Sequence, residues 1–199
     1  MNFLLKSAFT LLIILSFNSC KKSTNLSNKK ETKTVWTKDN FPSDWAGNYS
    51  GDLNIFSVDS IGMNLKMDLK IEAVTDSVYT WQLTYKMDGK EADVRAYELN
   101  LVNEKRGHYI INEKNTIKID AFYRNRIFTS FFKVMDSYII ATYTREKNDI
   151  VFEIISASDK EKTITGNTTY NGEEIPEVTT YFINGRQKGI LKKVVPQTD

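Results

Sequence analysis

Apolar and polar side chains alternate along much of this 199-residue chain, and this rhythm limits its fold more than any other feature. Every second residue is apolar over 65–71, 79–87 and 117–121, and lysine, aspartate, threonine or glutamine fills the positions between. Strict alternation indicates β-strands that have one face in a core and the other in water. The chain is therefore expected to be all-β.

Short polar segments separate these runs at the spacing of β-hairpins. Asp88-Gly89 and Asn148-Asp149 are pairs that tolerate the positive φ angles of tight turns. No long amphipathic helix interrupts the series. Because closure is the simplest way to remove exposed strand edges, we expect an antiparallel up-and-down meander closing into a barrel of about 8–10 strands over residues 41–199.

Two of the expected strands carry large apolar groups on both faces. They cover residues 126–135 and 138–143. Both faces are therefore expected to be covered. A segment of residues 20–40, the C-terminal residues 178–194, a short helix or a partner are all able to supply the cover, and the sequence leaves the choice open.

The C-terminal third contains two segments expected to lack strand structure, followed by a final arm. Residues 157–162 are charged and are expected to form a turn, and 171–176 are expected to form a loop. Residues 178–183 and 189–194 have strand character and are separated by Asn184-Gly185. We expect this arm to pair with the first strand and close the barrel.

The N-terminus has the pattern of an export signal. A basic residue, Lys6, precedes an apolar block from Ala8 to Phe17 that is too short for the ~20 residues of a membrane-spanning helix. Ser19, a small residue, stands directly before Cys20, the only cysteine. An ordinary secretory signal with an incidental cysteine is the alternative, but a lone thiol would be a liability in an oxidising compartment.

Residues 15–20 resemble the lipobox of bacterial lipoproteins, although Phe17 and Asn18 depart from its usual aliphatic and small residues. Such relaxed lipoboxes occur in Bacteroidetes. The resemblance implies that residues 1–19 are a lipoprotein signal peptide and that Cys20 is diacylated and becomes the first residue. Several acyl chains hold a protein stably on a membrane, whereas one holds it only marginally.

Residues 20–40 are expected to be a disordered basic tether, since they contain too few large apolar groups to offset the entropy of ordering. The whole chain has 27 basic and 25 acidic residues. Six basic and two acidic residues lie in this tether and Lys6 lies in the signal, which leaves 20 basic and 23 acidic residues from Phe41 onward. The tether can lie against anionic lipid headgroups. No basic stripe remains on the domain to indicate nucleic acid. By resemblance, Lys21 and Lys22 after the cysteine favour a protein anchored in the cell envelope that faces the periplasm.

The start of the domain, Trp45-Ala46-Gly47-Asn48-Tyr49-Ser50-Gly51, resembles the first strand of lipocalin-like, or calycin, barrels. In these barrels an aromatic ring after a glycine plugs the closed end, and Tyr49 takes that place here. Gly47 and Gly51 are expected to permit a bend and a close backbone approach. Residues 107–115 and 138–155 look similar to uncharacterised envelope lipoproteins of Bacteroidetes.

Residues able to carry chemistry are few. His108 is the only histidine, so a multi-histidine metal site and a two-histidine mechanism are excluded. His108 is able to act with Glu113 or Asp120, but a lone strand histidine is more often a hydrogen-bonded surface group. No phosphate-binding loop or calcium loop is recognisable. We expect no enzyme, no catalytic residue, no metal and no cofactor.

Aromatic residues are abundant and would suit either a packed core or a lined pocket. An eight-stranded barrel is just wide enough to be filled or to hold one small ligand. The pocket candidates are Tyr49, Tyr79, Trp81, Tyr85, Tyr97 and Phe131, with Arg95 and Gln82 as possible orienters of a charged headgroup.

Two functions follow from these alternatives. The first is a lipid-anchored barrel that binds a small hydrophobic or amphipathic ligand, and the second is a solid-cored module that docks an envelope protein. Convergence of the candidates on a void would favour the first. Ser60 and Ser77 also lie in Asp-Ser-apolar segments that resemble the O-glycan acceptors of Bacteroidetes.

Overall fold

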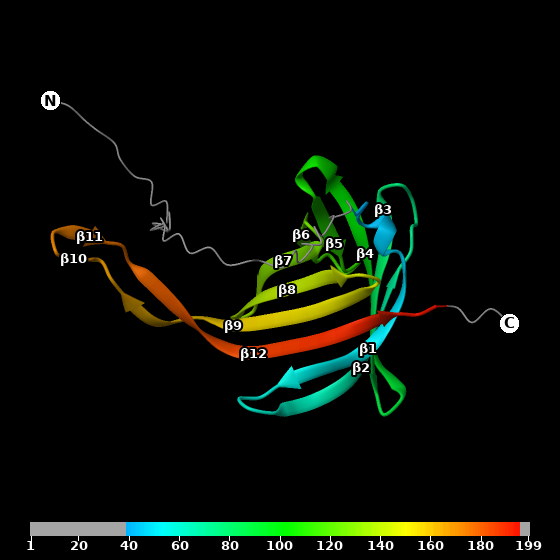
Figure 1. Ribbon diagram of the computed structural model, residues 1–199, viewed down its shortest axis with the longest axis horizontal. Coiled ribbons are helices and arrows are strands. Elements are labelled where there is room, and N and C mark those ends of the chain that lie inside the picture. The colour runs from blue at the N-terminus through cyan, green and yellow to red at the C-terminus, as the bar shows by residue number, and fades with distance from the viewer. Residues whose placement is uncertain (1–38, 196–199) are drawn as a thin grey trace, which may run out of the picture. The chain divides into compact units, whose positions relative to one another are not determined.

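The computed structural model describes residues 39–195, and the predicted signal peptide, Cys20 and most of the tether lie outside these residues (Figure 1). A 3-10 helix, η1 (Ser43–Trp45), leads into β1. The long strands are β1 (Gly47–Phe56), β2 (Ile61–Ile71), β3 (Val78–Met87), β4 (Lys90–Asn103), β5 (His108–Asn112), β6 (Lys118–Arg124), β7 (Ile127–Val134), β8 (Ser137–Glu146), β9 (Asp149–Thr165) and β12 (Val178–Lys193). A short 3-10 helix, η2 (Glu104–Arg106), joins β4 to β5.

These ten strands form a closed antiparallel barrel in the order β1-β12-β9-β8-β7-β6-β5-β4-β3-β2. Strands β1 to β9 follow one another as a meander, and β12 inserts between β9 and β1. The expected all-β barrel is confirmed, and so is its closure by the C-terminal arm. The alternation that runs through the sequence places one face of each strand inside, as in Trp81 and Leu83 of β3.

A two-stranded ribbon extends beyond the barrel (Figure 1). It consists of the far part of β9 and the near part of β12, and the small hairpin of β10 (Thr168–Tyr170) and β11 (Glu173–Ile175) ends it. The expected turn over residues 157–162 is wrong, because β12 pairs with this segment and holds it extended. Asn184-Gly185 does not separate two strands either, since both lie inside β12 at a register shift.

The two ends of the barrel differ. At the closed end, β1 begins, β12 ends and η1 lies with its Trp45 side chain fully buried. At the open end, the β1–β2 turn and the ribbon leave the barrel. Fully buried side chains fill the interior: Trp45, Tyr49, Leu53, Met67, Leu69, Ile71, Trp81, Leu99, Phe128, Ile150, Phe152 and Leu191.

Residues 39–195 leave much of the outer face of β7 and β8 exposed, and the expected cover by residues 20–38 or by a partner stays a prediction. Phe131 is 65% exposed, and Ile140, its register partner, is also exposed. Of the expected covers, the C-terminal arm contributes the Tyr181 ring, whose centroid lies 5.6 Å from that of Tyr138.

Candidate functional site

The closed end is sealed by an aromatic plug. Phe41 stacks on Tyr123 with centroids 4.6 Å apart and meets Trp45 and Tyr109 edge-on at 4.9 and 5.0 Å. The Tyr49 hydroxyl donates a hydrogen bond to the Trp45 carbonyl at 2.7 Å. Such edge and stacked pairs are the favoured geometries of aromatic rings. This end of the barrel therefore gives no access to the interior.

A carboxylate fastens the start of the described chain to this plug. The Asp39 side chain, 7% exposed, lies 3.6 Å from Arg126 and 3.6 Å from Arg145. It also accepts a hydrogen bond from Trp45 Nε1 at 3.3 Å. Asp39 was expected to belong to the tether, yet its side chain is part of the barrel's closed end.

The middle of the barrel is packed with rings. Trp81 meets Phe128 at 5.2 Å and Tyr143 at 5.0 Å, and Tyr143 meets Phe152 at 4.9 Å. Burial raises the pKa of the Tyr143 hydroxyl far above its usual value, and Tyr85 adds to the rise. The nearby Trp81 side chain partly opposes this rise in the pKa of Tyr143. The Trp81 Nε1 atom is nevertheless buried without a hydrogen-bond partner. The rings occupy the space that a ligand would need.

Four of the six pocket candidates, Tyr79, Trp81, Tyr85 and Tyr97, lie on the inner face of β3 and β4, where Trp81 and Tyr97 are register partners. The six as a set do not converge. Tyr49 and Trp81 are core residues. Tyr79 lines a shallow groove of about 320 Å³ at the closed end, beside Phe41 and Tyr109. Tyr85 and Tyr97 lie half-buried toward the open end, and Phe131 points outward. No common void is lined by the six.

The open end carries a small charged cluster on inward-facing positions. Arg95 pairs with Leu83 across β3 and β4, which places it on the inner face, and its Nε donates to Asp93 at 2.8 Å. The guanidinium lies 5.1 Å from the centre of the Tyr85 ring. Burial raises the pKa of Tyr85 and of Tyr97, and Arg95 opposes both shifts. Gln82 lies in a polar groove on the outer surface instead.

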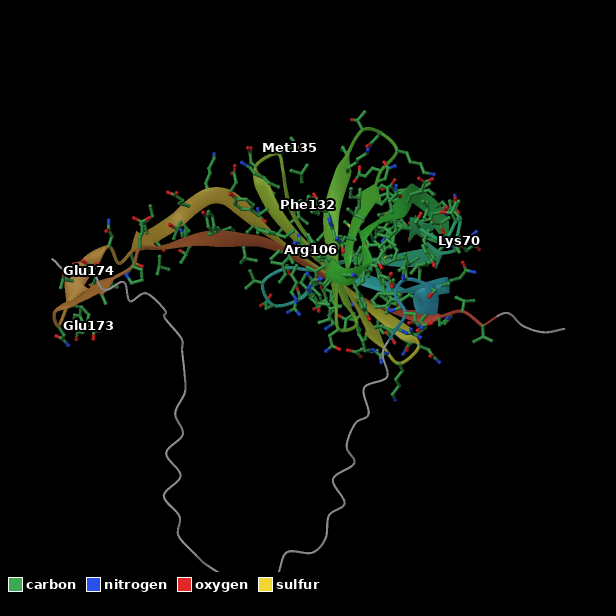
Figure 2. All side chains as sticks on the ribbon, turned by 90° about the horizontal axis from the view of Figure 1, so that it is seen from above. Lys70, Arg106, Phe132, Met135, Glu173 and Glu174 are labelled. Carbon is green, nitrogen blue, oxygen red and sulfur yellow. The ribbon has the colours of Figure 1, made fainter. Side chains whose placement is uncertain are left out.

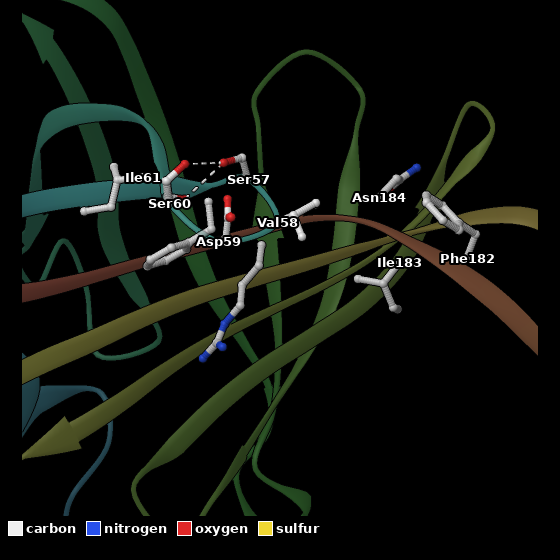
Figure 3. A pocket seen from close by; sticks show the side chains of 11 residues that line it. Ser57, Val58, Asp59, Ser60, Ile61, Phe182, Ile183 and Asn184 are labelled. Atoms are coloured by element: carbon white, nitrogen blue, oxygen red, sulfur yellow. Dashed lines mark hydrogen bonds between the residues drawn. The ribbon is translucent and has the colours of Figure 1, made fainter.

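Two apolar grooves lie at the outer surface of the open end. The first groove, of about 670 Å³, lies between the β1–β2 turn and β12 (Figure 3). In it, Val58 and Asp59 of the turn stand on one side and Phe182 and Ile183 on the other. Ser60, a predicted glycan acceptor, lines this groove, and its hydroxyl lies 2.7 Å from that of Ser57.

The second groove, of about 500 Å³, crosses the outer face of β7, β8, β9 and β12. Register aligns Phe131 with Ile140 and Ile140 with Ile155. The groove is lined by Phe131, Tyr138, Ile140, Ile155, Ala157, Thr179, Thr180, Tyr181 and Ile183. Sequence reasoning named only Phe131 among these. The sequence signal for this groove was the presence of large apolar residues on both faces of residues 126–135 and 138–143.

His108 is engaged at the closed end. Its Nε2 lies 2.6 Å from an Asp120 oxygen, and its ring stacks on Phe122 at 4.8 Å. Within residues 39–195 there is no group of three or more histidine, cysteine or acidic side chains able to hold a metal ion. In the same part of the chain, no helix has the length and apolar character needed to cross a membrane.

Sequence comparison with protein families and with curated proteins adds no relatives. The chain matches no protein-family model, and no curated protein is similar to it in sequence. The fold and the site geometry therefore carry the functional argument.

Proposed function

We propose that the protein is a non-catalytic, lipid-anchored module of the cell envelope that docks another protein on its outer surface. The observation that carries the proposal is the contrast between the two sides of the barrel wall. Trp81, Phe128 and Tyr143 pack the interior, whereas Phe131 and Ile140 stand exposed outside. A packed interior favours docking over ligand storage.

The second groove has the properties of a docking surface. Monomeric proteins rarely leave large contiguous apolar patches in water. Here Phe131, Ile140 and Ile155 form a continuous row across three strands, and Tyr138 and Tyr181 flank it. Aromatic residues such as these often dominate the affinity of interfaces.

A photocrosslinking experiment in cells tests the docking function. We expect p-benzoylphenylalanine in place of Phe131 to give a defined protein adduct, and Ile140→Glu in the same chain to abolish it by placing a charge in the groove. The matched control is Phe122, an exposed phenylalanine on β6, where the same probe should give no such adduct. Equal adducts from both positions would refute the proposal.

A small amphipathic ligand at the open end is the second candidate function. The observation that favours it is Arg95, which faces inward beside Tyr85 and suits an anionic headgroup. Titration of the full chain with dodecanoate checks this function by calorimetry. Binding that weakens at least tenfold in Arg95→Gln, but not in Arg106→Gln, would support it, and no measurable binding would exclude this probe class.

Anchoring through Cys20 is part of the proposal, although Cys20 lies outside the described residues. We expect the intact mass of the exported protein to exceed that of residues 20–199 by the mass of its acyl chains. Cys20→Ala should release the protein from the membrane fraction. The same mass spectrum would also show the added mass of any glycan on Ser60 or Ser77, both of which are exposed. A soluble protein with an unmodified Cys20 would contradict lipidation.

A further inference from the structure

Basic side chains gather on three connections at the closed end of the barrel, although acidic residues outnumber basic ones from Phe41 onward. In an antiparallel meander every second connection lies at the same end, which brings together residues 104–107, 124–126 and 145–148. Two carboxylates, Glu104 and Glu146, lie on these segments. The segments carry six cations, here named the basic arc: Lys105, Arg106, Arg124, Arg126, Arg145 and Lys147.

Hydrogen bonds hold the basic arc together as one surface. Arg124 donates from Nη1 to the Arg106 carbonyl, which joins the first connection to the second. Arg126 and Arg145 both donate to the Lys147 carbonyl, at 3.5 and 3.0 Å, which joins the second connection to the third. These acceptors are main-chain oxygens, so the bonds order the cations without neutralising their charge.

Most of this positive charge has no carboxylate beside it. Within residues 39–195 the arc's ion pairs are those of Asp39, which lies 3.6 Å from both Arg126 and Arg145. By contrast, Lys66 on the barrel wall pairs with Asp52 at 3.0 Å. Four exposed cations of the arc lack such a partner in this part of the chain: Lys105, Arg106, Arg124 and Lys147. Unbalanced like charges repel one another, so an external anionic surface would stabilise this end.

Two of the cations occupy turn positions that favour glycine. Asn125 and Arg126 both have positive φ, as in a type I′ turn, whose second central residue is usually glycine. Lys147 has φ +58° at the first central position of the β8–β9 turn, where type II′ turns carry glycine. Such strain is typical of functional positions. The charges therefore stand where a smaller residue would be less strained.

The ribbon carries the opposite charge at its tip. Glu173 and Glu174 are exposed there, and Glu177 follows them. Figure 2 shows the ribbon running out from the barrel to Glu173 and Glu174, whereas Arg106 lies on the barrel. An anionic surface attracts the basic arc and repels this tip, so it would orient the molecule with the closed end toward the surface.

The sequence before the barrel indicates which anionic surface this is. Residues 20–38 contain six lysines and one glutamate, and they lead into Asp39 at the closed end. Polybasic segments beside a lipid anchor bind anionic headgroups, and each cation adds to the attraction. The proposed anchor at Cys20 brings a bilayer within reach of this end. The arc is therefore suited to the same partner as the lysines that precede it.

We propose that the basic arc binds the headgroups of an anionic bilayer, with the closed end of the barrel facing the lipid. Guanidinium groups match phosphate oxygens in geometry, which suits Arg106 and Arg124 to this contact. Both apolar grooves lie at the open end, so they stay free for a partner. The contact goes beyond the proposed docking function and does not depend on it.

Vesicle binding by residues 20–199 with Cys20→Ala, which lack the signal and the anchor, tests the contact. We expect binding to vesicles of equal parts phosphatidylglycerol and phosphatidylcholine, and none to phosphatidylcholine alone. Lys105→Glu with Lys147→Glu should weaken the binding about tenfold or more, because each cation near an anionic surface adds to the affinity. Lys90→Glu with Lys118→Glu is the matched control, since it changes the net charge equally at exposed lysines of the open end. It should leave the affinity within about twofold, because salt screens charges that lie far from the surface.

Fluorescent labels test the orientation independently. Cys20 is the only cysteine, so the Cys20→Ala chain accepts one new cysteine at a chosen site. A label on Asn148→Cys, in the β8–β9 turn, should be quenched by spin labels on the lipid headgroups. A label on Val134→Cys, at the open end of β7, should not.

Three results would overturn the inference: equal losses in the two glutamate pairs, equal binding to neutral vesicles, or quenching at residue 134 as strong as at residue 148. A defined Phe131 photocrosslink would in each case leave the docking function standing. Loss of the photocrosslink with intact vesicle binding would instead remove the docking function and keep the membrane contact.

Discussion

At the scale of single residues, the Asp39 carboxylate fixes the closed end. Replacing Asp39 with alanine removes the shared partner of Arg126 and Arg145. It also leaves the indole Nε1–H of Trp45 without its acceptor. Removing one side of a buried charge cluster typically costs ~3–5 kcal/mol, and partial solvation of the arginines reduces this. We therefore expect the free energy of unfolding to fall by about 2–4 kcal/mol in urea titrations.

Asp52→Ala provides the control for Asp39. Asp52 pairs with Lys66 at 3.0 Å, but both side chains are more than half exposed, so this pair should contribute less than ~1 kcal/mol. Equal losses in the two variants would show that Asp39 acts as an ordinary surface charge.

A buried tyrosine at the same end makes stability depend on alkaline pH. Burial raises the pKa of Tyr109 to about 12, and its hydroxyl donates to the Phe41 carbonyl at 3.0 Å. An unfolded tyrosine loses its proton near pH 10. The folded state therefore holds the proton more tightly, so its stabilisation is complete below pH ~10 and is lost as pH rises to about 12.

Urea midpoints measured from pH 9 to 11 check this dependence. Tyr109→Phe should flatten the decline, since the variant has no proton to lose at this position. Tyr170→Phe, at the exposed tip of the ribbon, should follow the wild-type curve. An unchanged slope in Tyr109→Phe would assign the alkaline sensitivity to other groups.

At the scale of elements, Gly51 permits β1 and β12 to approach. A Cβ at this position would lie 2.1 Å from the Ile190 carbonyl oxygen, so the strands would have to separate. We expect Gly51→Ala to cost ~1–3 kcal/mol, as overpacking typically does, measured by thermal and urea unfolding. Gly62→Ala is the matched control, because its nearest neighbour atom lies at 3.6 Å. Equal stability of the two variants would argue against close approach at Gly51.

Local pattern predicted the barrel strands well and the ribbon poorly. Apolar and polar residues alternate where a strand buries only one face. This pattern therefore identified segments such as 79–87, whose inward residues include Trp81. The ribbon has no buried face to produce such a pattern. Residues 157–162 are charged like a turn, and pairing with β12, far along the chain, keeps them extended. Contacts between distant segments leave little trace in either segment alone.

The candidate site was predictable only in part. Apolar residues on both faces of β7 and β8 predicted a cover over the outer face, and Phe131 is exposed there. The sequence assigned Phe131 to an interior pocket, because alternation alone does not fix which face turns inward when both are apolar. Ile155 and Ile183 joined the groove only through strand register.

At the scale of the whole molecule, β12 is expected to be indispensable and the tip of the ribbon dispensable. Truncation after Pro176 removes the strand that joins β9 to β1, which opens the barrel. We expect such a chain to lose its cooperative thermal transition. Replacing residues 166–177 with Asn-Gly should instead leave the transition within a few degrees of wild type, because β10 and β11 pair only with each other. Unchanged unfolding of the truncated chain would show that closure is not needed.

The ion pairs of Asp39 with Arg126 and Arg145 also have a mechanical consequence. A pull between the proposed lipid anchor and a proposed partner docked on the barrel would enter the barrel through Asp39 and the aromatic plug. It then passes along β1, which pairs with β2 and with β12 on its two sides. Force along a strand loads its hydrogen bonds together and not one after another. The closed end, where the chain enters β1, is therefore well arranged to bear tension.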